Sequence, residues 1–157
     1  MAAVVVVTAI FGAASASTSA AGGRPGQLCD AALTRSTWSN FIVAFNVGNY
    51  QRLDALFARA QDFGWYSSNV PGLRNLGAAK NRATLLSYFR ARHAQRDRMQ
   101  LLAFAYRGEG NFTYRLRRSA RDYSSGAWFR LIGKGAATCS GGTAQLVVVS
   151  LGGPGSG

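Results

Sequence analysis

The segment "NFIVAFNVGNYQRLDALFARAQDFGWYSS" (residues 40–68) contains two helical patterns, a short joint and an aromatic run typical of a strand. Large apolar residues recur every three or four positions in residues 29–47, which predicts a helix with one apolar face. Gly48 is well placed as the left-handed residue that follows this helix, and Asn49 as the cap of a second, shorter helix. The segment therefore predicts two helices that meet at a tight corner.

The rest of the chain continues with a strand, a loop, a helix and four more strands. Residues 61–68 form the aromatic run, residues 69–81 contain Pro, Asn and Gly without periodicity, and residues 82–94 repeat the helical pattern. Four strand patterns follow at residues 99–107, 111–119, 127–137 and 143–151, each bounded by Gly, Ser or Asn. This order predicts an α+β fold in which the helices cover one face of an antiparallel sheet.

Alternation along residues 111–119 predicts which side chains share a face of the sheet. The strand separates into an apolar set and a more polar set, namely Phe112, Tyr114 and Leu116 opposite Thr113, Arg115 and Arg117. The sequence leaves open which of these two sets meets the helices.

The joint Asn46-Val47-Gly48-Asn49, the aromatic helix before it and the order of elements together resemble nuclear transport factor 2-like domains. This superfamily includes SnoaL-like polyketide cyclases and ketosteroid isomerases, and the resemblance covers about residues 29–151. It implies a cone-like curved antiparallel sheet packed against three helices, the cystatin-like roll. It also implies a pocket between the first helix and the concave sheet face, and frequent homodimers through the sheet. It implies no particular reaction, because this fold hosts both enzymes and binding modules.

The domain boundaries follow from composition. The run "AAVVVVTAIFGAA" and the small residues after it are typical of a signal peptide over residues 1–20, and the run is too short for a transmembrane helix. We expect a linker at residues 21–28, the folded domain at 29–151 and a flexible tail at 152–157. The protein is then secreted or extracytoplasmic; the alternative is that the first residues form an apolar tail.

The two cysteines and the net charge bear on compartment and partners. A Cys29–Cys139 disulfide would fit export, although two buried thiols are the alternative.

The net charge is +12, and 16 of the 18 basic residues are Arg. Such an excess attracts anionic polymers or surfaces, including nucleic acid, anionic lipid and cell-wall polymers. A solvated basic face is the alternative interpretation.

Candidate catalytic residues are few. The resemblance to SnoaL-like enzymes and ketosteroid isomerases implies a carboxylate base opposite a Tyr or a second acid. Asp62, just before the aromatic strand, and His93, the only histidine, are the candidates for such a base. Each has a plain structural alternative, as a cap or ion-pair partner for Asp62 and as a solvated helix-end residue for His93. We expect Asp54 on a solvated face and Asp97 in a surface ion pair.

Aromatic residues are the stronger signal for a ligand. We predict a pocket for an apolar, ring-shaped molecule, although several of these residues would also suit a core. The candidate ligand-binding residues lie on the predicted helices and strands: Trp38, Phe41, Trp65, Arg82, Tyr106 and Tyr114. The sequence contains no phosphate-binding loop, metal-ligand cluster or Ser-His-Asp set, so we expect no metal and no cofactor. The segment "GKGAA" (residues 133–137) lies within a strand pattern and is not a phosphate loop.

Three functions remain open from the sequence. The first is an exported, non-catalytic small-molecule-binding or interaction domain with an aromatic pocket, which the thin inventory of acids favours. The second is a SnoaL-like isomerase, cyclase or dehydratase that uses Asp62 or His93. The third is a basic protein that binds polyanions through its arginines.

Overall fold

A computed structural model of the chain describes residues 29–59, 63–67, 79–121 and 128–152. The elements follow in the predicted order: α1 (Ala31–Val47), α2 (Tyr50–Leu56), β1 (Gly64–Ser67), α3 (Arg82–Ala94), β2 (Arg98–Gly108), β3 (Asn111–Ser119), β4 (Phe129–Ser140) and β5 (Thr143–Gly152). The predicted signal peptide and linker, the residues after Gly152 and the catalytic candidate Asp62 lie outside the described residues.

The helix boundaries are set by caps that the sequence signals. Asp30 adopts an extended conformation and its Oδ1 accepts a hydrogen bond from the backbone N–H of Leu33 at 2.8 Å, so α1 begins at residue 31 rather than 29. Gly48 ends α1 with a left-handed φ of 71°. Asn49 then caps α2 through a 2.9 Å hydrogen bond from the N–H of Arg52. The predicted corner between the two helices is confirmed.

The sheet has five strands in the order β1-β5-β4-β3-β2. Strands β2 to β5 are antiparallel neighbours, but β1 runs parallel to β5. The four antiparallel strands predicted after α3 are confirmed, and the pairing of β1 makes the sheet mixed. The chain between β1 and β5 includes α3 and three other strands, which gives it the length that a parallel pairing requires.

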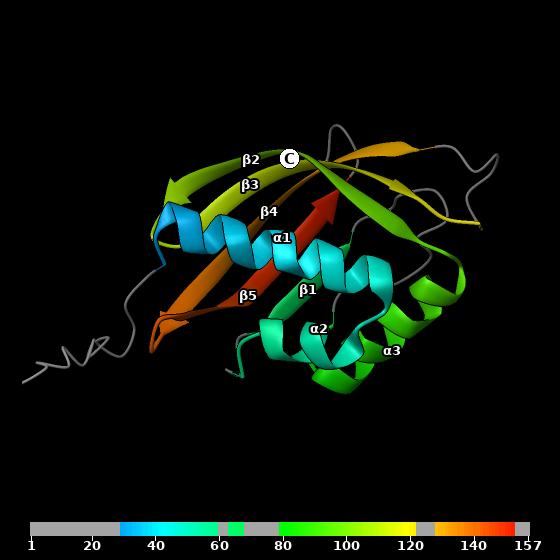
Figure 1. The fold of residues 1–157 in the computed structure, drawn as a ribbon, viewed down its shortest axis with the longest axis horizontal. Coiled ribbons are helices and arrows are strands. Elements are labelled where there is room, and N and C mark those ends of the chain that lie inside the picture. Colours follow the sequence, from blue (N-terminus) through cyan, green and yellow to red (C-terminus); the bar gives the residue numbers. More distant parts are fainter. Residues whose placement is uncertain (1–28, 60–62, 68–78, 122–127, 153–157) are drawn as a thin grey trace, which may run out of the picture.

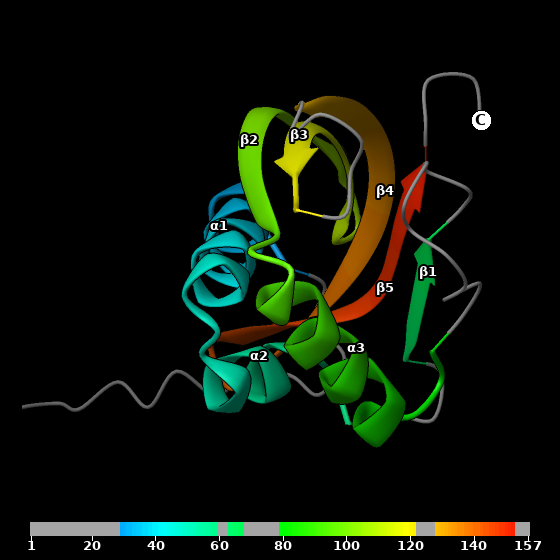
Figure 2. The same cartoon turned by 90° about the vertical axis from the view of Figure 1, so that its right-hand side faces the viewer.

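The helices cover one face of the curved sheet (Figure 1). Figure 2 shows that β4 bends strongly along its length, so that the sheet curves toward the helices. Buried aromatic residues from α1 meet buried aromatic residues from β3: Trp38 lies 5.5 Å from Phe112 and 4.3 Å from Tyr114, measured between ring centroids. The apolar set of β3 thus faces the helices, and the α+β architecture with three helices on a curved sheet is confirmed.

Two glycines of β4 make room for these rings. A Cβ built on Gly133 would collide with the Tyr114 ring and with the carbonyl oxygen of Ser150. One built on Gly135 would lie 2.5 Å from Cζ of Phe112 and 2.9 Å from the carbonyl oxygen of Val148. The "GKG" segment therefore lets two aromatic side chains of β3 lie directly against the backbone of β4.

We expect Gly133→Ala to lower the free energy of unfolding by about 1–3 kcal/mol, because the added methyl group overpacks a contact that includes backbone atoms. Urea denaturation followed by circular dichroism measures the change. Lys134→Ala is the matched control, since Lys134 is exposed on the other face of the same strand, and we expect a change within about 0.5 kcal/mol. Equal effects of the two substitutions would contradict this packing role.

Candidate functional site

The predicted aromatic ligand-binding residues lie in the hydrophobic core. Trp38, Phe41 and Trp65 are each 0% exposed and Tyr114 is 3% exposed. Their rings contact one another, with centroid distances of 4.9 Å from Trp38 to Phe41 and 5.6 Å from Phe41 to Trp65. A ligand could enter this cluster only if the rings moved apart. Ligand binding by these residues stays a prediction.

The aromatic cluster also contains two buried polar atoms. The indole Nε1 atoms of Trp38 and Trp65 are buried without a hydrogen-bond partner among the residues that the structure describes. A buried donor without a partner costs about 1–3 kcal/mol, and a water molecule or a polar group of a ligand would relieve that cost.

The hydroxyl group of Tyr114 donates a 2.9 Å hydrogen bond to the carbonyl oxygen of Ser150 on β5. Burial raises the pKa of Tyr114 well above the ordinary value of 10.0, and the nearby Arg118 guanidinium opposes this shift. The phenol therefore stays protonated and serves as a cross-strand bond between β3 and β5.

Because the pKa of Tyr114 is raised in the folded state, the associated stability is complete below about pH 10 and is lost as the pH rises through the folded-state pKa. We expect Tyr114→Phe to be about 1 kcal/mol less stable than the native chain at pH 7, owing to the lost hydrogen bond. This difference should shrink above pH 10. Urea titrations of both proteins between pH 7 and 11 measure it, and a difference that stays constant across that range would contradict the assignment.

Arg82 holds two helices together. Its Nε donates to Oδ1 of Asp54 at 2.6 Å, and its guanidinium also donates to the backbone carbonyls of Asp54, Phe57 and Ala58. The start of α3 is thereby tied to the end of α2. Asp54, expected on a solvated face, is 29% exposed and serves this contact. Ligand binding by Arg82 would compete with these bonds, and it stays a prediction.

Asp97 is an ion-pair partner, as expected, but its predicted position at the surface is wrong. Its side chain is 0% exposed and accepts hydrogen bonds from Nε of Arg92 at 2.5 Å and from Nη2 of Arg118 at 2.7 Å. The turn after α3 folds Asp97 inward, with Arg96 at a left-handed φ of 53° and the Asp97 N–H bonded to the carbonyl of Arg92. Arg118 arrives from β3, which the local sequence around Asp97 does not reveal.

His93 lies at the corner between α1 and α2. Its ring occupies the space beside Gly48, where an added Cβ would lie 2.7 Å from Cε1, and it stands edge-on to Tyr50 at 6.2 Å. His93 is absent from the buried aromatic cluster. Its position gives it a packing role at the corner, and a role as a catalytic base stays a prediction, as it does for Asp62.

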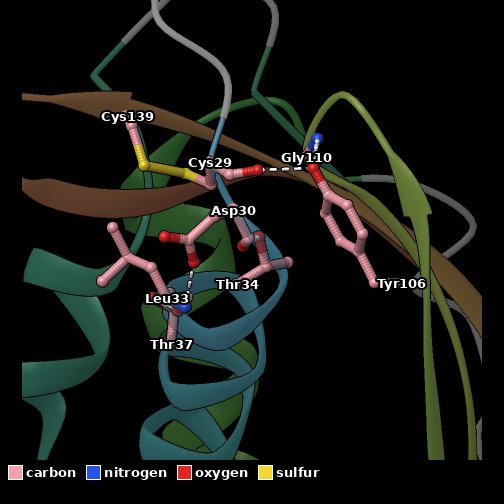
Figure 3. Close-up of a disulfide and its surroundings, with 8 residues drawn as sticks. All are labelled: Cys29, Asp30, Leu33, Thr34, Thr37, Tyr106, Gly110 and Cys139. Atoms are coloured by element: carbon pink, nitrogen blue, oxygen red, sulfur yellow. Dashed lines mark hydrogen bonds between the residues drawn. A yellow bond between two sulfur atoms is a disulfide. The ribbon is translucent and has the colours of Figure 1, made fainter.

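Cys29 and Cys139 form a disulfide, which joins the start of α1 to the far end of β4 (Figure 3). Tyr106 reinforces this junction, since its hydroxyl group donates to the carbonyl oxygen of Cys29 at 2.6 Å and accepts from the N–H of Gly110 at 3.2 Å. The predicted ligand residue Tyr106 therefore holds the beginning of the domain against the β2–β3 hairpin.

The face of the sheet that points away from α1, here called the outer face, carries a hollow that the sequence analysis missed. Cross-strand pairs define it: Ala105 is paired with Thr113, Thr113 with Lys134, and Lys134 with Ser150. The neighbouring row pairs Ala103 with Arg115 and Arg115 with Ile132. These two rows line a trough of about 530 Å³ that crosses four strands.

The lining of the trough combines apolar side chains with basic ones. Ala103, Ala105 and Ile132 provide apolar surface, and Arg107, Arg115 and Lys134 provide positive charge. Arg107 is held in place by a 3.1 Å hydrogen bond from its Nε to Oγ1 of Thr113. None of the five strands contains Asp or Glu. The polar set on residues 111–119 was the sequence signal for this face, but only the strand register brings it beside Lys134.

The described part of the chain contains no group of three or more His, Cys, Asp or Glu side chains that could hold a metal ion. No helix within the same residues has the length and apolar character needed to cross a membrane.

The comparisons with known proteins establish the fold. No family model and no curated protein matches the chain. A nuclear transport factor 2-like protein of unknown function from Cytophaga hutchinsonii matches with a TM-score of 0.53 and 12% identity, over 82% of this chain and 92% of that one. A cystatin-like protein of unknown function from Nostoc punctiforme matches with a TM-score of 0.60 and 15% identity, over 78% and 90%.

A candidate polyketide cyclase from Sinorhizobium meliloti matches as well, with a TM-score of 0.55 and 14% identity, over 74% of this chain and 93% of that one. The chain therefore has the nuclear transport factor 2-like, cystatin-like fold that its joint motif and element order resemble. Identities of 12–15% establish the fold and leave the activity to be argued from the residues.

Proposed function

We propose that this protein is an exported, non-catalytic domain that binds a small molecule with an apolar body, and that the trough of the outer face is its binding site. The trough volume of about 530 Å³ lies within the range of about 300–1,000 Å³ that is usual for small-molecule sites. A lining that includes Ala103, Ala105 and Ile132 with a few charged groups among them has the composition usual for such a site. This open, partly apolar hollow is the observation that carries the proposal.

The structural roles of the acidic side chains support a non-catalytic function. Asp30 caps α1, Asp54 pairs with Arg82, and Asp97 is buried between two arginines. Glu109 is exposed at the turn of the β2–β3 hairpin. Each of these carboxylates, the ones that the structure describes, already has a structural role or lies in solvent. A SnoaL-like activity would instead depend on Asp62 or His93.

Export is supported by the disulfide. Cys29–Cys139 encloses a sequence separation of 110 residues and joins both ends of the domain, an arrangement that persists in oxidising compartments. The apolar run before Cys29 has the composition of a signal peptide. The two observations point to the same extracytoplasmic location.

A sheet-to-sheet homodimer is a weaker use of the outer face. Two copies facing each other would bring together Arg107, Arg115 and Lys134 from both chains without any strand carboxylate to compensate. A small ligand avoids this repulsion. The homodimer stays a prediction, and sedimentation velocity measures it.

The binding proposal is tested with N-phenyl-1-naphthylamine, an uncharged probe whose fluorescence rises in apolar sites. We expect Ala105→Trp, which fills the trough, to weaken binding of this probe at least about tenfold, equivalent to about 1.4 kcal/mol. Val43→Trp is the matched control, because Val43 is 61% exposed on α1, and this variant should bind as the native chain does.

If the Ala105→Trp variant binds the probe as tightly as the native chain does, the binding site lies outside the trough. A parallel Trp65→Ala variant would then test the aromatic cluster, where loss of binding with retained circular dichroism would favour the interior site. Detection of a turnover product that disappears in Asp62→Asn or His93→Gln would contradict the non-catalytic assignment.

A further inference from the structure

Building on the proposed function, we infer that the ligand of the trough is an organic anion, an apolar body that carries one carboxylate, sulfonate or phosphate group. The head group would be held by Arg107, Arg115 and Lys134, and the body would lie on Ala103, Ala105 and Ile132.

The strand register places two of these cations on either side of Thr113. Lys134 is its cross-strand partner on β4, and Arg107, on β2, donates to its hydroxyl group at 3.1 Å. Arg115 follows two residues along β3 on the same face, a distance of about 7 Å along a strand. The three cations therefore line neighbouring positions of the trough.

Among the residues that the structure describes, no ion pair with a carboxylate is formed by Arg107, Arg115 or Lys134. No strand contributes a carboxylate, and Glu109 and Asp97 lie beyond the ends of β2. An anionic head group would replace the missing counter-charge through hydrogen bonds assisted by charge, which are about twice as strong as neutral ones. Arg107 is already oriented by Thr113, so less side-chain freedom is lost when it binds an anion.

The rest of the trough favours an apolar, flat body. Ala103 and Ala105 carry small side chains, and Gly133 and Gly152 add backbone without side chains. Ile132 is 40% exposed, so a ligand covering it would remove apolar surface from water. A planar ring system fits such a surface because it can approach the sheet closely.

A small anion agrees better with the surrounding arginines than a long polyanion does. Arg117, in the next row, donates to Oε1 of Gln100 at 2.6 Å and lies over the Trp128 ring at 4.9 Å. A polyanion tracking along the face would have to displace these contacts. The head group of a small ligand reaches the three trough cations without disturbing them.

A matched pair of probes tests the inference on the full folded chain. 1-Anilinonaphthalene-8-sulfonate carries the same two ring systems as N-phenyl-1-naphthylamine plus one sulfonate group. We expect the sulfonate probe to bind about tenfold more tightly than the neutral one at low salt, and this advantage to shrink at high salt.

Charge-neutralising variants locate the effect. We expect Arg115→Gln with Lys134→Gln to remove the advantage of the sulfonate probe, so that the two probes bind this variant with affinities within about twofold of each other. Arg52→Gln, an exposed arginine on α2, is the control for net charge and should keep the advantage. Circular dichroism and the urea midpoint confirm that every variant is folded.

The outcomes separate the inference from the proposed function. Failure of both probes to bind overturns the proposed function and, with it, this inference. Equal affinities for the two probes, or an advantage that survives in the Arg115/Lys134 variant, overturn the inference alone. Displacement of the sulfonate probe by single-stranded oligothymidylate, lost in an Arg117→Gln, Arg130→Gln variant, would also overturn it in favour of polyanion binding.

Discussion

Replacing Asp97 with alanine is expected to lower the free energy of unfolding by about 3–5 kcal/mol. The carboxylate is 0% exposed and lies between Arg92 and Arg118, which are themselves buried. Removing it takes from two buried guanidinium groups the carboxylate that they share. Most of the cost comes from the positive charge that stays buried without this carboxylate, and not from the lost attraction itself. Since a domain of this size has a total stability of about 5–15 kcal/mol, much of the variant would be unfolded at moderate urea concentrations.

Asp54→Ala is the matched control, because Asp54 also pairs with an arginine but keeps 29% of its side chain exposed. We expect a loss of only about 1 kcal/mol there, since water screens the charge that remains on Arg82. Urea denaturation of both variants in the same buffer gives the comparison. A smaller loss for Asp97→Ala than for Asp54→Ala would contradict the burial argument.

The second large effect concerns the disulfide. The double variant Cys29→Ser, Cys139→Ser is expected to lose about 2–5 kcal/mol of stability, because the bond restricts an unfolded chain over a sequence separation of 110 residues. The native protein should lose a similar amount when a reducing agent is added, whereas the double variant should not respond to it. Thermal unfolding with and without dithiothreitol measures both.

The Tyr106 hydroxyl group provides a control for the same junction. Tyr106→Phe removes the hydrogen bonds to Cys29 and Gly110 but leaves the disulfide, so we expect a loss of about 1 kcal/mol and continued sensitivity to reductant. A native chain whose stability is unaffected by reductant would show that the bridge does not contribute, whatever the behaviour of Tyr106.

The two faces of the sheet differ in their side chains and in their proposed roles. The face toward α1 is filled by aromatic rings that contact each other at 4.3–5.6 Å between Trp38, Phe41, Trp65 and Tyr114. The outer face carries the trough and its cations. The resemblance to nuclear transport factor 2-like domains implied a pocket between helix and sheet, whereas the open hollow described here is on the opposite side. The proposed function follows this difference.

The sequence predicted local structure well where a local interaction decides it. Gly48 and Asn49 act through a backbone conformation and a hydrogen bond within three or four residues, so the joint between α1 and α2 could be predicted from the sequence. The Asp30 cap, which places the start of α1 at residue 31, was not predicted. Alternation on β3 separated the buried set from the basic set correctly, since successive side chains of a strand point to opposite faces. The element order then sufficed to predict the α+β fold.

The Cys29–Cys139 disulfide was predicted because the chain has only two cysteines, but other interactions between distant residues were beyond the sequence. Arg118 meets Asp97 across 21 positions, Arg82 meets Asp54 across 28, and Lys134 joins Arg115 on the outer face only through the register of β3 and β4. The parallel pairing of β1 with β5 likewise depends on the path of the chain between them, which brings β5 back beside β1. The sequence by itself determined caps, periodicity and the class of fold, because these depend on neighbours along the chain. The buried ion pairs, the closed aromatic interior and the trough were decided by the tertiary structure. Each of them forms between residues that are far apart in the sequence, and only the folded chain brings these residues together and shields them from water.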